Sequence, residues 1–298
     1  MKILLLGKNG QLGWELQRSL GVLGEVVALD RNKLGGDLSD HDALYARVMR
    51  ESPQVIVNAA AYTAVDKAES EGELAMAINA TAPGAILTTA AEQLGALLLH
   101  YSSDYVFDGS GDQPRDEDAE IGPLSTYGVS KAAAETAIRA SACQHLILRT
   151  SWVYAARGGN FAKTMLKLAS EREELKVIKD QIGAPTGADL LADLTAQMIP
   201  ATLANPQLCG LYNAQAAGET SWHAYACHVI EYARARGAPI KVAADKVLPI
   251  PTSDYPTPAQ RPLNSRLDCA KLRANFNLTL PPWQQGVERM LDEISPKR

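Results

Sequence analysis

Tyr127 and Lys131 form a YxxxK pair in a segment, 127–140, that we expect to be helical. Four-residue spacing puts both side chains on one face of a helix, one turn apart. An ammonium group beside a phenol favours the tyrosinate and so lowers the pKa of the phenol. The pair is therefore predicted to exchange a proton with a carbinol or ketone oxygen near neutral pH.

A hydroxyl follows an expected buried strand over 96–101, at Ser103. Side chains at the carboxyl ends of parallel strands point into the crevice where α/β folds bind ligands. Ser103 is predicted to hydrogen-bond the substrate oxygen next to Tyr127. Serine is also common at turns after strands. This prediction therefore depends on the presence, in the same chain, of the YxxxK pair and of the loop described next.

A GxxGxxG loop, formed by Gly7, Gly10 and Gly13, joins an expected strand over 2–6 to a helix over 13–20. Glycines let the backbone turn tightly and approach a pyrophosphate, whose charge is met by amides at the helix start. A plain glycine-rich turn would look the same in isolation. The position in the first strand–helix unit favours a dinucleotide site.

The second expected strand ends at Asp30, followed directly by Arg31. An acidic residue at this point accepts hydrogen bonds from the adenosine ribose and favours NAD. Arg31 can pair with the 2′-phosphate of NADP, or it is a solvated surface charge. The dipeptide predicts weak discrimination between NADH and NADPH.

Short apolar runs alternate with helix-like segments through the first half of the chain, as parallel sheets covered by helices require. The prediction is an α/β fold: a Rossmann-type doubly wound parallel sheet with a smaller carboxyl-terminal α/β substrate domain. We place the NAD(P)-binding domain at 1–150 and the substrate domain mainly at 151–298. Segments near 175–180 and 210–214 are expected to extend the sheet.

The composition of the 298 residues is that of a soluble globular protein, with 46% hydrophobic and 21% charged residues. A formal charge of −5 argues against nucleic acid as a partner. We see no signal sequence, and no window approaches the length of a membrane span. Four widely separated cysteines suit a reducing compartment, so a cytoplasmic location is expected.

Several blocks of the chain resemble the extended short-chain dehydrogenase/reductase family and, more narrowly, its dTDP-4-dehydrorhamnose reductases. Beside the glycine loop, Ser103 and the YxxxK pair, these blocks are residues 58–69, 101–107, 149–154 and 181–186. The resemblance implies NADPH- or NADH-dependent reduction of the 4-keto group of dTDP-4-dehydro-β-L-rhamnose to dTDP-β-L-rhamnose. That reaction is the last step of dTDP-rhamnose synthesis, which supplies polysaccharide biosynthesis, and its partner is a small nucleotide sugar.

The resemblance also implies roles for individual residues. Tyr127 would donate the proton, Lys131 would bind the nicotinamide ribose, and Ser103 stands where the family commonly has threonine. The cofactor set is Gly7, Gly10, Gln11, Leu12, Gly13, Asp30, Arg31, Asp37, Leu38, Ala61, Tyr62, Thr63, Tyr101, Tyr127 and Lys131. The substrate set is Ser103, Asp104, Trp152 and Arg261. Arg261 is the first candidate for the diphosphate because that anion needs cations, with Arg157, Lys163 and Arg266 as further candidates.

Some members of this family form dimers through a divalent cation held by carboxylates. The matching positions here are Glu15, Asp189 and Glu293. Carboxylate oxygens suit Mg²⁺, but Asp189 is shorter than the usual glutamate, and solvated surface carboxylates are the simpler interpretation. A magnesium-linked homodimer is thus an expectation that depends wholly on the resemblance.

Two other functions compete with the reductase. A nucleotide-sugar 4,6-dehydratase or 4-epimerase would use tightly bound NAD; dehydratases usually have an acidic pair here, but Tyr105 follows Asp104. A non-catalytic NADP-binding regulatory subunit would need no proton donor, yet Tyr127, Lys131 and Ser103 are all present.

Overall fold

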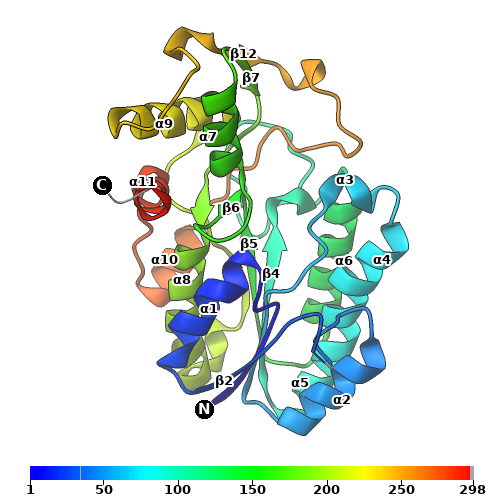
Figure 1. The fold of residues 1–298 in the computed structure, drawn as a ribbon. Coiled ribbons are helices and arrows are strands. Elements are labelled where there is room, and N and C mark those ends of the chain that lie inside the picture. The colour runs from blue at the N-terminus through cyan, green and yellow to red at the C-terminus, as the bar shows by residue number, and fades with distance from the viewer. Residues whose placement is uncertain (34, 296–298) are drawn as a thin grey trace.

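A six-stranded parallel sheet forms the centre of the computed structural model, which describes residues 1–33 and 35–295 (Figure 1). The chain runs from β1 outward to β2 and then crosses to β3 on the other side of β1, so the sheet is doubly wound, as predicted. In spatial order the strands are β10 (Gly210–Asn213), β5 (His145–Thr150), β4 (Leu97–Ser103), β3 (Val55–Asn58), β1 (Lys2–Leu6) and β2 (Glu25–Leu29).

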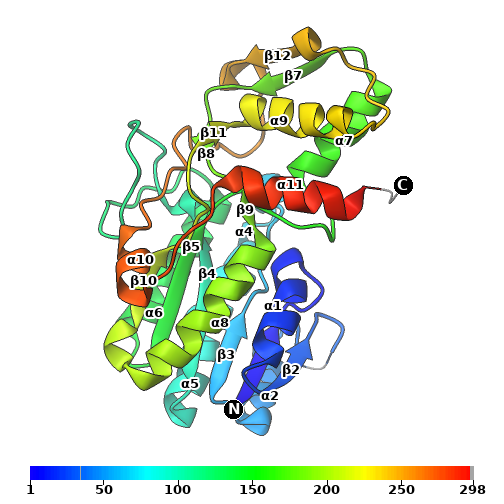
Figure 2. The same cartoon turned by 90° about the vertical axis from the view of Figure 1, so that its left-hand side faces the viewer.

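Helices cover both faces of this sheet, because its strands are apolar on both sides. Ile3 and Leu5 of β1 belong to one core cluster and Leu4 and Leu6 to the other. The first face packs against α1 (Gln11–Gly21), α8 (Ala188–Ala204) and α10 (Ala270–Phe276), and α1 and α8 lie side by side in Figure 2. The second face packs against α2 (His41–Glu51), α5 (Thr88–Leu94) and α6 (Thr126–Ala140).

One helical segment contradicts the expectation that no stretch approaches a membrane span. The helices α4 (Gly72–Met76), η1 (Ala77–Leu87, a π-helix) and α5 form a continuous segment, Gly72–Leu94, long and apolar enough to cross a membrane. Half of its most apolar window is buried inside the protein, where it packs against α6. The π-helical widening accommodates Pro83, which has no N–H to donate within the helix.

The second half of the chain adds a smaller group of elements at the carboxyl end of the sheet. Here α7 (Phe161–Glu171), α9 (Trp222–Ala235) and α11 (Trp283–Ile294) pack beside three two-stranded sheets. These sheets are β7 (Leu175–Ile178) with β12 (Val247–Ile250), β6 (Val153–Tyr154) with β9 (Thr186–Gly187), and β8 (Ile182–Gly183) with β11 (Thr220–Ser221).

Within the described part of the second half, residues 151–295, one strand joins the central sheet. The segment near 210–214 supplies β10, but the prediction for 175–180 is wrong, since β7 pairs with β12 outside the sheet. A short apolar run carries no information about which distant strand it will pair with. The boundary at residue 150 stays a prediction, and α8 and α10 from beyond it pack on the central sheet.

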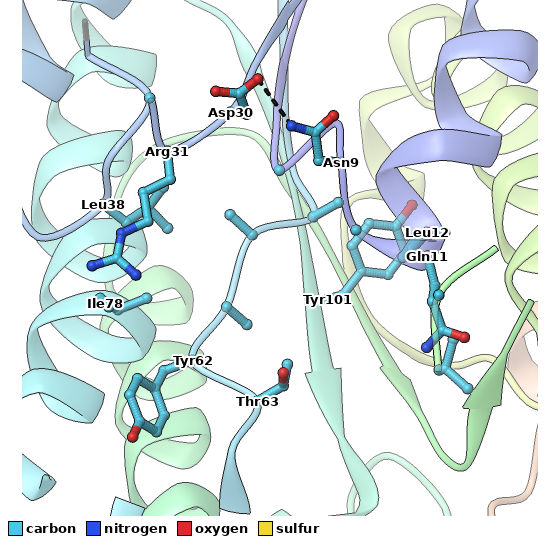
Figure 3. A pocket seen from close by; sticks show the side chains of 18 of the residues that line it. Asn9, Gln11, Leu12, Asp30, Arg31, Leu38, Tyr62, Thr63, Ile78 and Tyr101 are labelled. Atoms are coloured by element: carbon cyan, nitrogen blue, oxygen red, sulfur yellow. Dashed lines mark hydrogen bonds between the residues drawn. The ribbon is translucent and has the colours of Figure 1, made fainter. Parts of the chain in front are cut away.

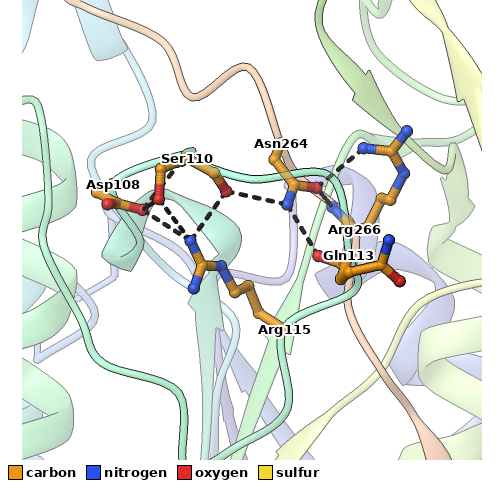
Figure 4. A network of polar contacts seen from close by, with 6 residues as sticks. All are labelled: Asp108, Ser110, Gln113, Arg115, Asn264 and Arg266. Atoms are coloured by element: carbon orange, nitrogen blue, oxygen red, sulfur yellow. Dashed lines mark hydrogen bonds and ion pairs between the residues drawn. The ribbon is translucent and has the colours of Figure 1, made fainter.

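A polar network ties the loop after β4 to the carboxyl-terminal part of the chain (Figure 4). The Asn264 amide donates to the carbonyl oxygens of Ser110 and Gln113, at 3.3 and 2.9 Å, and accepts from Arg266 at 3.2 Å. Arg115 in turn donates to Asp108 at 3.1 Å. These bonds fix the segment that leads into residues 264–266 beside the end of β4.

A buried ion pair joins α6 to β5. Arg149 donates to the Glu135 carboxylate through Nε at 3.0 Å and Nη2 at 2.7 Å, and both side chains are almost fully buried. Its Nη1 also donates to the Glu117 carbonyl at 3.3 Å, and the guanidinium lies over the Phe107 ring. Because α6 carries Tyr127 and Lys131, this pair fixes the helix of the YxxxK motif against the sheet.

Replacing Glu135 with glutamine is expected to destabilise the fold, because Arg149 would keep a buried charge without its counter-ion. We expect a loss of about 3–5 kcal/mol in the free energy of unfolding, measured by urea denaturation. The control is Lys241→Met, which removes an exposed pair with Glu173 and should cost less than about 1 kcal/mol. Equal losses for the two variants would contradict a structural role for the buried pair.

Candidate active site

A cavity of about 750 Å³ opens at the carboxyl ends of β1 and β3, the adjacent strands at which the order of the sheet reverses direction. All of the predicted cofactor residues except Gly13 line it, and Asn9, Ala59, Ala60, Ile78, Thr150, Val153 and Gly158 were not foreseen. The structure thus brings the predicted set together around one space. Their contacts with a cofactor stay predictions.

The glycine loop is shaped by close backbone contacts. Gly7 has φ +86°, and a Cβ there would lie 2.7 Å from the Ala60 nitrogen. Gly13 does not line the cavity: a Cβ on it would lie 2.0 Å from the Gly7 carbonyl oxygen, so it lets α1 pack against the loop. No side chain caps the start of α1 at Gly10. The amides there are placed to meet a pyrophosphate.

Asp30 lies at the cavity wall with its carboxylate already oriented (Figure 3). Asn9 donates to it at 3.0 Å, the Asn32 amide at 2.9 Å, and Lys8 lies 3.5 Å away. The Asn32 hydrogen bond, ahead of those from Lys8 and Asn9, holds the pKa of Asp30 below its ordinary value. Asp30 is therefore an ionised acceptor, as a ribose-binding carboxylate must be.

Arg31 lies on the opposite side of the cavity from Gln11 and Leu12 (Figure 3). Its side chain is 76% exposed and its Nε lies 3.5 Å from Asp37. An exposed guanidinium can donate hydrogen bonds to a 2′-phosphate, and the weak discrimination between the two cofactors stays a prediction.

Asn79, which sequence reasoning left without a role, connects the cofactor loop to the catalytic helix. Its amide accepts from the Tyr62 nitrogen at 2.8 Å and donates to the Tyr62 carbonyl and the Ser130 hydroxyl, each at 3.0 Å. Tyr62 is held further by its hydroxyl, which donates to Glu71 at 2.5 Å. An asparagine within an otherwise apolar helical stretch was the signal available in the sequence.

Tyr127 sits in the first turn of α6, which Ser125 caps by accepting from the Gly128 amide at 3.2 Å. Burial and then the nearby Asp104 carboxylate raise the pKa of Tyr127 to about 12, opposed by a hydrogen bond with Ser103. The prediction that Lys131 lowers this pKa is wrong for the described structure. Burial sets the direction of the shift, and the Lys131 ammonium is directed at the Tyr101 carbonyl oxygen and not at the phenol.

Lys131 is buried and directed at the end of β4. Its Nζ donates to the Tyr101 carbonyl oxygen at 2.6 Å and lies 3.3 Å from Nε2 of His100. Burial lowers the pKa of Lys131 to about 8, although the negative charge of Glu135 acts in the opposite direction. His100 was not predicted; a histidine directly after the apolar run Leu97–Leu99 was the signal for it.

Ser103 and Asp104 stand together where β4 ends. The Ser103 hydroxyl donates to Asp104 Oδ1 at 2.9 Å and accepts from the Tyr105 amide at 3.2 Å. Burial raises the pKa of Asp104 to about 6, opposed by hydrogen bonds including those from Ser265 and Ser103. The Tyr105 ring packs edge-on against Tyr127, with centroids 5.5 Å apart. Ser103 and Tyr127 are thus brought together as predicted.

None of the four predicted substrate residues lines this cavity, although Ser103 and Asp104 directly follow Ser102, which does. The Trp152 ring stacks on Trp222 with centroids 3.6 Å apart, and its backbone has φ +48°. Such a conformation costs a bulky residue about 1–3 kcal/mol and is concentrated at functional sites. Arg261 donates to both Asp66 carboxylate oxygens, at 3.2 and 2.9 Å, so its guanidinium already has an anionic partner.

The three carboxylates expected to hold Mg²⁺ interact but form no metal site. Burial and then the charges of Asp189 and Glu293 raise the pKa of Glu15 against the opposing effect of Arg18. Arg18 Nε lies 3.6 Å from Glu15, and Arg289 Nη1 lies 3.3 Å from Asp189. Over residues 1–33 and 35–295, no group of three or more metal-ligating side chains is placed to bind an ion. The set does not fit Mg²⁺ here.

Comparison with known proteins places this arrangement among sugar-nucleotide enzymes. The family model described as "RmlD substrate binding domain" matches residues 1–295. The dTDP-4-dehydrorhamnose reductase of Escherichia coli K12 is 54% identical over 296 residues, covering 99% of this chain and 98% of the relative. A Clostridium acetobutylicum reductase structure of that name has a TM-score of 0.88 at 34% identity, covering 99% of both chains. One from Bacillus anthracis, in complex with NADP, has a TM-score of 0.86 at 34% identity, covering 98% of this chain and 99% of its own.

Gly13→Ala is expected to weaken dinucleotide binding by about tenfold or more, since its methyl group would force α1 away from the Gly7 carbonyl. Fluorescence titration with NADPH measures the dissociation constant, and circular dichroism checks the fold. Gly21→Ala, in the same helix with no atom within 4 Å of the added carbon, is the matched control and should bind normally. Normal binding by a folded Gly13→Ala protein would overturn the role assigned to the loop.

Chelation should leave the size of the protein unchanged, because Arg18 and Arg289 already partner two of the three carboxylates. Sedimentation velocity with EDTA and with added Mg²⁺ is expected to give the same sedimentation coefficient. A larger species that appears with Mg²⁺ and is lost with EDTA would restore the metal-linked dimer.

Proposed function

This chain belongs to the RmlD family of dTDP-4-dehydrorhamnose reductases, and on that premise we propose that it reduces the 4-keto group of dTDP-4-dehydro-β-L-rhamnose to dTDP-β-L-rhamnose. NADPH or NADH is the reductant, and the reaction takes place in the cytoplasm. The observation that carries the proposal is that Tyr127, which lines the cavity, lies within hydrogen-bonding reach of Ser103, the residue that follows the cavity-lining Ser102.

The chain's own part in the reaction is to hold and move a proton. A bound nicotinamide supplies the hydride that reaches the carbonyl carbon of the sugar. Tyr127 is fully protonated at neutral pH, because burial keeps its pKa near 12, and its Oη–H protonates the sugar oxygen as negative charge develops there. The Ser103 hydroxyl, which donates to Asp104 in the structure, would turn from it to donate a second hydrogen bond to that oxygen and so stabilise the same charge.

Lys131 acts at the cofactor side of this site. With its ammonium anchored to the Tyr101 carbonyl, it has further N–H groups to offer to the nicotinamide ribose. The helix-start amides at Gln11 and Leu12 would hold the pyrophosphate and Asp30 the adenosine ribose. Asp37 and Leu38 would flank the adenine, and Ala61, Tyr62 and Thr63 would line the cleft.

The substrate is expected to approach from the side of the smaller group of elements. Trp152, held in a left-handed conformation against Trp222, would form a wall for the sugar, and Asp104 would bind a sugar hydroxyl. Arg261 would reach the diphosphate, but it must share or leave its pair with Asp66 to do so. Because of the ion pair with Asp66, we expect Arg261 to bind the diphosphate more weakly than an unpaired guanidinium would.

A 4-epimerase, a 4,6-dehydratase and a regulatory subunit fit the site less well. Tyr105 occupies the position where a dehydratase would have a second acid, and its ring packs against Tyr127. A regulatory subunit has no need of a buried phenol beside Ser103. Purified reductase should exchange its cofactor freely, whereas tight retention of NAD would favour the epimerase or dehydratase.

Tyr127→Phe should lower turnover by about 10²-fold or more, because the variant has no proton to donate, while NADPH binding is kept. The assay supplies dTDP-4-dehydrorhamnose, follows cofactor oxidation with NADH and NADPH separately, and identifies the sugar formed. Tyr45→Phe, which loses only a hydrogen bond to Gln93 on a distant helix, is the control. Retained activity in Tyr127→Phe would contradict the mechanism. If the unaltered chain forms no dTDP-rhamnose, the proposed function is wrong.

A further inference from the structure

A chain of hydrogen-bonding groups runs from the cofactor loop to Lys131 through two buried residues. The Ala60 amide donates to Asn58 Oδ1 at 3.2 Å, Asn58 Nδ2 lies 3.1 Å from His100 Nδ1, and His100 Nε2 lies 3.3 Å from Lys131 Nζ. Asn58 and His100 are register partners on β3 and β4, and each is 1% exposed. Water therefore does not interrupt the chain at either residue.

The first link determines which atom each group presents to the next. A backbone N–H can only donate, so the Asn58 atom that faces Ala60 is the amide oxygen. The Asn58 nitrogen then faces His100, and its N–H must find an acceptor at Nδ1. A neutral imidazole that accepts at Nδ1 carries its proton on Nε2. Burial also lowers the pKa of His100, ahead of the repulsion from Lys131, so the ring is neutral.

The Nε2–H bond of this tautomer points at an amine that is itself a donor. An ammonium would place its positive charge against the positive end of the N–H dipole. A neutral amine instead has a lone pair that can accept a hydrogen bond from this N–H. The separations agree with this conflict: Lys131 lies 2.6 Å from the Tyr101 carbonyl, as a charge-assisted bond does, but 3.3 Å from His100.

We propose that His100 is a positioning residue whose Nε2–H, held in place by Asn58, disfavours the ammonium form of Lys131 and so sets the pH at which the charged lysine is lost. Desolvation acts in the same direction. The opposing charge is Glu135 on the same helix, which is paired with Arg149 on β5. Tyr127 on α6 and Asp104 after β4 are the other titratable groups at this end of the helix.

This inference deepens the proposed function, on which its kinetic consequence depends. Because the Asn58 amide receives its orientation from Ala60, which lines the cofactor cavity, the lysine's charge is linked to the conformation of the cofactor loop. A neutral lysine offers fewer N–H groups to the nicotinamide ribose. Activity should therefore fall at alkaline pH as Lys131 loses its proton.

The tautomer is measured on the unaltered chain without substrate, by ¹⁵N NMR of protein labelled at histidine. His41, His145, His223 and His228 are partly exposed and are assigned by replacing each with glutamine, which leaves the His100 signals. We expect the unprotonated ring nitrogen of His100 to be Nδ1. An unprotonated Nε2 would overturn the proposal, and this result does not depend on whether the chain is a reductase.

His100→Leu tests the consequence in the pH profile of kcat. Removing the opposing N–H should shift the alkaline limb of the profile, where kcat falls as Lys131 loses its proton, to higher pH by about one pH unit. If His100 instead accepted a hydrogen bond from the ammonium, its loss would shift the limb to lower pH. If His100 had only a structural role, its loss would lower kcat without shifting the limb. Either result overturns the proposal. Thr195→Val, which removes a buried hydroxyl bonded to Tyr101 at 2.6 Å, is the packing control and should leave the limb in place. If His100→Leu does not fold, the NMR result decides alone.

Discussion

The parallel register of β3, β4 and β5 is the constraint on which the site depends. Asn58 pairs with His100, and Ser103 pairs with Thr150, so polar side chains that are distant in sequence end at one edge of the sheet. Parallel strands all present their carboxyl ends on the same side. A one-residue slip would turn each of these side chains to the opposite face.

Burial then gives these groups their chemistry. Desolvation penalises the charged form of every ionisable group, so it raises the pKa of Tyr127 and lowers that of Lys131. The phenol is thereby kept protonated for donation, while the lysine is brought close to losing its charge. The two residues of one helical motif are shifted in opposite directions by the same physical cause.

The ion pair between Arg149 and Glu135 connects stability to this chemistry. It fixes α6 against β5 and holds the Glu135 carboxylate one turn from Lys131, where its charge raises the pKa of that lysine against the effect of burial. Asn79 also holds α6 in place, because its amide links the backbone of Tyr62 in the cofactor loop to the Ser130 hydroxyl on this helix. The catalytic helix is therefore held at several points, each of which uses a buried polar side chain with satisfied partners.

Local patterns in the sequence were sufficient for the doubly wound sheet, the glycine loop and the YxxxK helix, because each depends on residues close together in the chain. Periodicity and turn chemistry report such short-range order directly. The same patterns also placed Ser103 near Tyr127, since the ends of parallel strands converge by topology.

Tertiary structure alone decided the remaining features. Only the fold shows that β7 pairs with β12, that Arg261 is bound to Asp66, and that guanidinium groups partner Glu15 and Asp189. It also reversed the expected pKa shift of Tyr127, because spacing reveals a neighbouring charge but not the loss of water around a side chain. Strand partners, ion-pair partners and desolvation are set by residues far apart in sequence, and no local pattern records them.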